Sequence, residues 1–207
     1  MLQINPKRRG ERTCGPRGID DSRVQKQISL LLVGRLLTTR PFNVEAFKRT
    51  MTQSWTLSGR VVIKPCGSNL FLFQFFHWRD KEKVLVGCPW CFDHQLLILN
   101  EIKANKQPSN VPLTHSPFWT RIYNLPLNYH SDDDVKTIVA NYGSIMDVEP
   151  DDFGLENFRR VKLKLDVSKP LRRYQRIKGK DGNIIRVEFK YERLPFFCYV
   201  CGIMGHS

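Results

Sequence analysis

The 207-residue sequence lacks the features that mark several large classes of protein. It has no apolar run near the roughly 20 residues that a membrane-spanning helix needs. Its basic N-terminal stretch, MLQINPKRRGERTCGPRG, has no apolar segment like that of a secretory signal. The patterns G-x-x-x-x-G-K-S/T, G-x-S-x-G and H-E-x-x-H, which mark common catalytic sites, are also missing. We therefore expect a protein of the nucleus or cytoplasm that is not secreted, is not an enzyme, and has no membrane partner and no small-molecule substrate.

The net charge of +13 is unevenly distributed along the chain. Residues Arg159–Arg193 hold thirteen Lys or Arg against four Asp or Glu, a net +9, whereas Ser131–Asn157 hold eight acids against one lysine, a net −7. Such asymmetry favours a polyanionic partner over a surface that is merely solvated. The basic residues expected to contact phosphates are Lys162, Lys164, Arg172, Arg173, Arg176, Lys178 and Lys180.

The C-terminal stretch RLPFFCYVCGIMGHS carries three quarters of a zinc-knuckle pattern. Six cysteines at irregular spacing favour thiols or metal ligands over disulfides in a protein that is not secreted. Cys198 and Cys201 form a C-x2-C pair, and His206 follows after four residues that include two glycines. Tetrahedral zinc takes four such ligands, and the fourth ligand of a C-x2-C-x4-H-x4-C knuckle would fall beyond Ser207. We therefore expect an incomplete site that holds zinc weakly.

The knuckle also carries large side chains that could contact a ligand. In an intact knuckle, exposed apolar and aromatic groups stack on bases, and the residues expected to do so here are Phe197, Tyr199 and Met204. The apolar stripes of the chain lie upstream of Pro195. We therefore expect the folded body not to depend on the knuckle or on zinc.

Several stretches of the chain resemble a plant family of retrotransposon-derived proteins. These stretches are LVGRLLTTRPFNVEAFKRTM, NLFLFQFFHWRDKEKVL, PWCFDHQLLIL, YNLPLNYHSDDDVKTI and KYERLPFFCYVCGIMGHS. In that family a domain of unknown function precedes a CCHC-type zinc knuckle. The resemblance covers most of the chain, from about Ser29 onward. It implies a nucleic-acid-binding protein of the kind encoded in the first reading frame of LINE-type elements, or a domesticated or decayed copy, with zinc as cofactor.

Hydrophobic and turn patterns predict an α+β protein with two units. Residues 1–27 show little apolar periodicity and are expected to form a disordered basic arm. Residues 28–100 show strand and helix patterns in the order β-α-β-β-α-β, which ferredoxin-like and RNA-recognition (RRM-like) domains share. A polar linker is expected at 101–117, a second similar unit with basic strands at 118–192, and the truncated knuckle at 193–207.

The second unit is less clearly patterned than the first. Its second helix is only faintly indicated, at Lys169–Ile177, and a single composite domain is the competing arrangement. Two motifs also have competing interpretations. Cys88 and Cys91 form another C-x2-C pair, but the pair follows a helix and leads into a strand, which favours a structural turn over a redox site. The rings of Phe71–Phe75 could stack on bases, although their strand has so few polar residues that burial on both faces is favoured.

The sequence thus favours a binder of RNA or single-stranded DNA with low sequence specificity. The alternative is a protein–protein self-assembly module, a homo-oligomer, in which the incomplete knuckle is inert. The two hypotheses differ in salt dependence, because phosphate binding weakens steeply with salt and apolar assembly does not.

Overall fold

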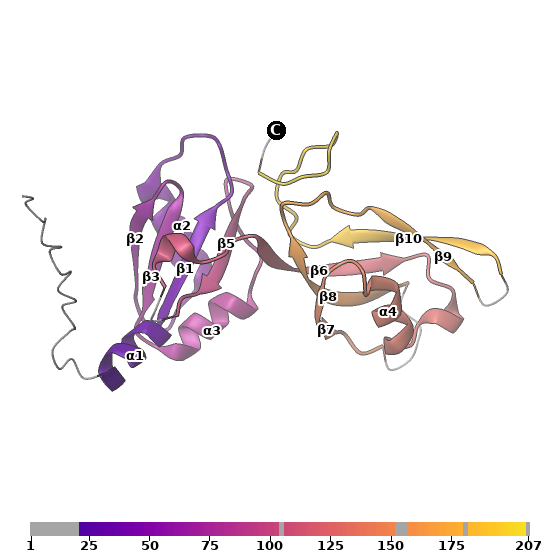
Figure 1. The fold of residues 1–207 in the computed structure, drawn as a ribbon, viewed down its shortest axis with the longest axis horizontal. Coiled ribbons are helices and arrows are strands. Elements are labelled where there is room, and N and C mark those ends of the chain that lie inside the picture. The colour runs from indigo at the N-terminus through magenta and orange to yellow at the C-terminus, as the bar shows by residue number, and fades with distance from the viewer. Residues whose placement is uncertain (1–20, 104–105, 152–156, 180–181, 206–207) are drawn as a thin grey trace, which may run out of the picture.

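A computed structural model describes residues 21–103, 106–151, 157–179 and 182–205. The fold is α+β, with two antiparallel five-stranded sheets side by side (Figure 1). Residues 1–20 of the expected basic arm lie outside the described residues. Residues 21–27 were wrongly expected to be disordered, because they form most of helix α1 (Asp21–Ser29). None of the helices among the described residues combines the length and the apolarity needed to cross a bilayer.

The first unit has the expected β-α-β-β-α-β order with one additional strand. Its sheet runs in the order β2-β3-β1-β5-β4, so that β5 takes the place of the fourth ferredoxin-like strand and β4 forms a hairpin with it. The elements are β1 (Leu31–Leu36), α2 (Val44–Trp55), β2 (Val61–Gly67), β3 (Leu70–Phe75), α3 (Trp78–Val86), β4 (Trp90–Phe92) and β5 (Gln95–Glu101).

One face of the first sheet packs against the two helices. Helix α2 begins after Asn43, whose Oδ1 accepts a hydrogen bond from the amide of Ala46 at 3.0 Å. Its apolar stripe, including Phe47 and Trp55, is fully buried and contacts the rings of β3. The side chains of Phe71, Phe73 and Phe75 are all at most 2% exposed. The interpretation of these rings as core is therefore confirmed.

The opposite face of the first sheet is covered by the chain that connects the two units. Val111 and Leu113 of this linker are each 7% exposed and share a core cluster with Val33 of β1 and Ile98 of β5. The linker contains a short 3-10 helix, η1 (Pro108–Asn110), which lies against β2. The side-chain amide of Asn100 also donates to the carbonyl of Pro112 at 3.1 Å. The linker is thus part of the core.

The second unit repeats the strand order of the first. Its sheet runs β7-β8-β6-β10-β9, and α4 covers one face with the buried side chains of Val135, Ile138 and Val139. The elements are β6 (His115–Tyr123), 3-10 helix η2 (Leu127–Tyr129), α4 (Asp132–Val139), β7 (Ser144–Val148), β8 (Phe158–Asp166), β9 (Tyr174–Lys178) and β10 (Ile184–Tyr191). The faint indication of a second helix at Lys169–Ile177 was wrong, because this range contains β9, which pairs with β10.

The knuckle segment docks at the junction of the two units (Figure 1). Met204 is 3% exposed and belongs to the same core cluster as the second sheet. The carbonyl of Gly202 accepts a hydrogen bond from the amide of Leu171 at 3.0 Å. On the first unit, a Cβ added at Gly205 (φ +86°) would lie 2.4 Å from Cγ of Leu37, so this position tolerates only glycine. The knuckle therefore contacts both units.

Candidate nucleic-acid interface

The face of the second sheet opposite α4 carries aromatic and basic side chains together. Side chains alternate between the two faces of a strand, and residues paired across strands share a face. We call this surface the open face. It is formed by Trp119, Arg121, Tyr123, Phe158, Arg160, Lys162, Lys164, Tyr174, Arg176, Lys178, Arg186, Glu188 and Lys190. The other faces of β6 and β8 point their apolar side chains into the core.

Two rings meet at the end of the central strands of the open face. Tyr123 of β6 lies opposite Phe158 of β8, with ring centroids 5.3 Å apart. The guanidinium of Arg121 lies 4.7 Å from the centroid of Phe158, and the ammonium of Lys190 lies 4.4 Å from that of Tyr123. On β9, the half-exposed ring of Tyr174 lies 4.2 Å from the guanidinium of Arg186. Such pairs combine stacking surface with positive charge.

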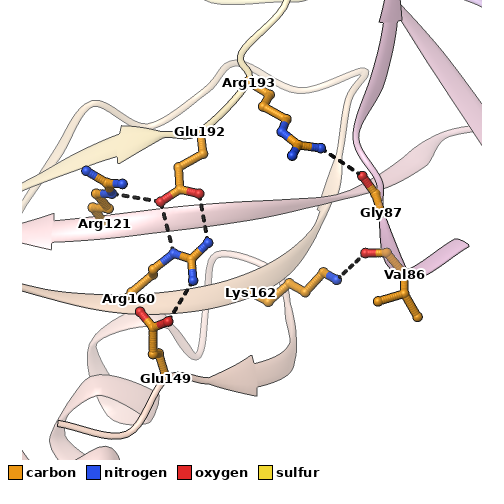
Figure 2. Close-up of polar contacts among 8 residues, drawn as sticks. All are labelled: Val86, Gly87, Arg121, Glu149, Arg160, Lys162, Glu192 and Arg193. Carbon is orange, nitrogen blue, oxygen red and sulfur yellow. Dashed lines mark hydrogen bonds and ion pairs between the residues drawn. The ribbon is translucent and has the colours of Figure 1, made fainter. Parts of the chain in front are cut away.

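The remaining ring, Trp119, is occupied by a fixed ion-pair network. Arg160 lies with its guanidinium 4.0 Å from the Trp119 centroid and donates two hydrogen bonds of 2.9 Å to the carboxylate of Glu192 (Figure 2). It also donates to Glu149, and Arg121 donates to Glu192 at 2.7 Å. The hydrogen bonds from Arg160 hold the pKa of Glu192 below its usual range. We therefore regard this network as structural support for the neighbouring rings.

Lys162 belongs to the open face by alternation, but its side chain is covered by the first unit. It is 8% exposed, because its ammonium donates a 2.9 Å hydrogen bond to the carbonyl of Val86 in the first unit (Figure 2). Arg193 likewise donates to the carbonyl of Gly87 at 3.2 Å. These cations satisfy carbonyls at the C-terminus of α3, where the helix dipole is negative. Lys162 therefore joins the two units and is withdrawn from phosphate contact.

The other basic residues expected to contact phosphates are exposed where the structure describes them. These residues are Lys164, Arg172, Arg173, Arg176 and Lys178, while Lys180 lies outside the described residues. Arg176 and Lys178 share the open face, whereas Arg173 donates to the carbonyl of Tyr199 in the knuckle at 2.9 Å. The basic segment therefore continues from the open face to the knuckle.

The knuckle turn brings the Cys198 thiol close to backbone amides. The backbone amides of Cys201 and Val200 point toward the sulfur of Cys198 and lower the pKa of its thiol. The amide of Gly202 donates to the carbonyl of Cys198 at 2.7 Å, which closes the turn. A C-x2-C pair suits zinc, and Cys198 and Cys201 fit this role. His206 lies outside the described residues, and no three His, Cys, Asp or Glu side chains gather in the remainder.

The expected stacking groups of the knuckle divide into three environments. Tyr199 is 79% exposed, as expected. Phe197 is half-buried and packs against the core cluster, with its ring centroid 4.9 Å from that of Tyr199. Met204 was wrongly expected to be exposed, because its side chain fills the core beneath the knuckle. Of the three, only Tyr199 presents most of its surface to solvent.

The second C-x2-C pair is a structural turn. Cys88 is buried and its thiol lies 3.5 Å from the carbonyl of Val84. Burial raises the pKa of Cys88 to about 12 and that of Cys91 to about 11. Neutral thiols of this kind are poor nucleophiles and poor metal ligands, which agrees with the structural interpretation.

Sequence reasoning did not identify the rings of the open face. Basic strands were expected in residues 118–192, but the outward positions of Trp119, Arg121 and Tyr123 were not assigned to a surface. Phe158, the first residue of β8, was not assigned to a surface either. Alternation of aromatic and basic residues along residues 119–123 is the signal that could have revealed this surface.

Comparisons with known proteins agree with this organisation. Residues 24–110 match the family described as Domain of unknown function (DUF4283), and residues 165–207 match the family described as Zinc knuckle. An uncharacterized protein of Arabidopsis thaliana is 26% identical over 129 residues, which are 61% of this chain and 40% of that protein. The chain thus spans less than half of that plant relative's length.

One solved structure also aligns with much of the chain. It contains the first two RRM domains of the yeast poly(U) binding protein Pub1 and covers 78% of this chain and 98% of its own. The sequence identity is 12% and the TM-score is 0.27.

Proposed function

We propose that this protein, in which a DUF4283 domain is followed by a zinc knuckle, binds RNA or single-stranded DNA with low sequence specificity and without catalysis. The carrying observation is the open face, where Tyr123 and Phe158 lie side by side next to cationic side chains. Aromatic rings stack on every base and cations contact the backbone, so neither contact selects a sequence.

Two further features support this proposal. The exposed Arg172, Arg173 and Arg176 extend the positive surface from the open face toward the knuckle. The knuckle offers the exposed ring of Tyr199 beside a C-x2-C cysteine pair that suits zinc. A role in a retrotransposon-derived plant protein, with zinc as cofactor, is part of the same proposal. When bound, zinc would fix the knuckle turn through Cys198 and Cys201.

A self-assembly module is the second candidate, and β7 favours it. This strand forms one edge of the second sheet, and its Ile145 and Met146 are 37% and 53% exposed. An edge strand with exposed apolar side chains can pair with another copy of the chain. Sedimentation at several protein concentrations measures this directly.

Fluorescence anisotropy with a labelled single-stranded RNA, titrated at several salt concentrations, tests the binding proposal. Replacing Arg172, Arg173 and Arg176 with alanine should make the slope of log affinity against log salt less negative by about 2. Each neutralised single-strand phosphate contributes about −0.7 to that slope. Tyr123→Leu with Phe158→Leu should instead weaken binding roughly tenfold or more at every salt concentration without changing the slope.

The thermal transition of each variant provides the control for folding. A parent protein that fails to bind at low salt would contradict the proposal and favour self-assembly. Unchanged affinity in the Tyr123→Leu and Phe158→Leu variant, with an intact thermal transition, would remove the open face as the binding surface.

A further inference from the structure

Two large exposed rings stand two residues apart in the sequence on the first unit, far along the sequence from the open face. Phe76 follows β3 and is 47% exposed, and Trp78 begins α3 and is 61% exposed. Neither ring belongs to the core clusters of the described residues. Single exposed apolar residues are common, but two exposed rings that flank the start of one helix are a candidate contact surface.

Each of these rings has a cationic partner. The guanidinium of Arg60 lies 4.3 Å from the centroid of Phe76, and that of Arg79 lies 5.6 Å from the centroid of Trp78. The imidazole of His77 stacks on Trp78 with an angle of 25° between the planes. The surface therefore combines π-faces with positive charge, as the open face does. We call Arg60, Phe76, Trp78 and Arg79 the α3 platform.

A buried carboxylate holds the α3 platform in place. Asp80 is 2% exposed and accepts hydrogen bonds of 2.9 Å from the amides of Ser58 and Gly59. These bonds fix the turn immediately before Arg60. On the other side, Nδ1 of His77 accepts a hydrogen bond from the amide of Arg79 at 3.2 Å, which caps α3 beside Trp78. Both ends of the platform are thus ordered before any ligand binds.

We propose that the α3 platform is a second base-stacking site, which binds a further stretch of the same single strand that occupies the open face. This inference rests on the proposed function. A nucleic-acid ligand suits the platform because its rings match bases and its arginines match phosphates. The sheet of the first unit cannot serve this purpose, because the helices cover one face and the linker residues Val111 and Leu113 pack against the other.

The test compares short and long single strands on the full chain. Oligouridines of about 8 and about 25 nucleotides are titrated against the parent and a Phe76→Leu, Trp78→Leu variant, which keeps apolar bulk but removes the rings. The long strand should bind the variant roughly tenfold more weakly than the parent, whereas the short strand should bind both equally. Photo-crosslinking with a 4-thiouridine strand should yield the peptide that contains Trp78.

An arginine pair on the first unit provides a matched control. Arg60→Ala should weaken binding of the long strand more than Arg49→Ala, which removes an exposed charge from α2 away from the platform rings. If the parent and the ring variant bind the long strand equally, the α3 platform is not a stacking site, and the proposal for the open face is unaffected. Failure of the parent to bind either strand would overturn both proposals. Loss of self-association in the ring variant, with RNA binding intact, would identify the platform as a protein contact instead.

Discussion

The ammonium of Lys162, in the middle of β8, donates a hydrogen bond to the carbonyl of Val86 at the end of α3 (2.9 Å). The two residues are 76 positions apart in the sequence and belong to different units, Lys162 to the second sheet and Val86 to a helix of the first unit. Because the lysine is almost fully buried, this bond joins the two units at a point where water is excluded. The contact therefore helps to fix how the two units are oriented relative to each other.

Lys162 and Lys164 provide a paired test of burial against exposure on one strand. Lys162→Met should lower the free energy of unfolding by about 1–3 kcal/mol, because a hydrogen bond from a charged group is lost and the Val86 carbonyl loses its donor. Lys164→Met should leave the free energy of unfolding nearly unchanged. It should make the slope of log RNA affinity against log salt less negative by about 0.7. Urea unfolding and anisotropy measure the two effects. Equal stability of both variants would contradict the burial of Lys162.

The knuckle should contribute to the stability of the body, contrary to the sequence-based expectation. Met204→Ala removes a side chain that is 3% exposed, and it should destabilise the protein by about 2 kcal/mol or more. Val200→Ala, in the same segment at 96% exposure, should have almost no effect. Thermal unfolding compares the two variants. A transition that is equally unaffected by both would restore the independent body expected from the sequence.

The two C-x2-C pairs should differ in zinc uptake. Cys198→Ser should lower the amount of zinc taken up during dialysis against a zinc-containing buffer, because backbone amides stabilise the thiolate of Cys198. Cys91→Ser should retain as much zinc as the parent, since burial keeps that thiol protonated. Metal analysis of the dialysed proteins checks this. Loss of zinc in the Cys91→Ser variant would place the metal at the first pair.

The ion-pair network of Glu192 should make the free energy of unfolding depend on pH. Arg160 holds the pKa of Glu192 below its ordinary value of 4.5, so the unfolded chain takes up a proton more readily than the folded one. The contribution of Glu192 is therefore present above pH 4.5 and is lost as the pH falls through the lowered value. Glu192→Gln should destabilise most near about pH 7 and least near about pH 3. A pH-independent difference from the parent, or an equal effect of Glu188→Gln, would argue against this network.

Alternation and capping made much of the fold predictable from local sequence. The Asn43 cap, the stripe of α2 and the buried rings of β3 follow from residues within a few positions of one another. The presence of strand β9 where a helix was indicated was not predictable in this way, because it depends on pairing with β10. Local helical preference in Lys169–Ile177 was weak and gave way to a partner strand.

The site was harder to predict than the fold because burial there depends on distant contacts. Lys162 and Met204 both carried local patterns of exposed ligand-binding residues. Each is buried by segments that only the tertiary structure brings near, the end of α3 for the lysine and the second sheet for the methionine. The rings of Tyr123 and Phe158 meet for the same reason, since their strands pair antiparallel across 35 residues of sequence.

The linker that packs on the first sheet also limits how many nucleic-acid strands one protein chain can bind at its sheets. Two sheets of the same order would suggest two equivalent footprints per molecule, but Val111 and Leu113 leave only the second sheet with an open face. In the proposed function each chain is therefore monovalent toward nucleic acid at its sheets. On a long nucleic-acid strand, each added protein chain would then occupy one sheet-binding footprint. The ratio of protein to nucleic acid at saturation would give the length of that footprint.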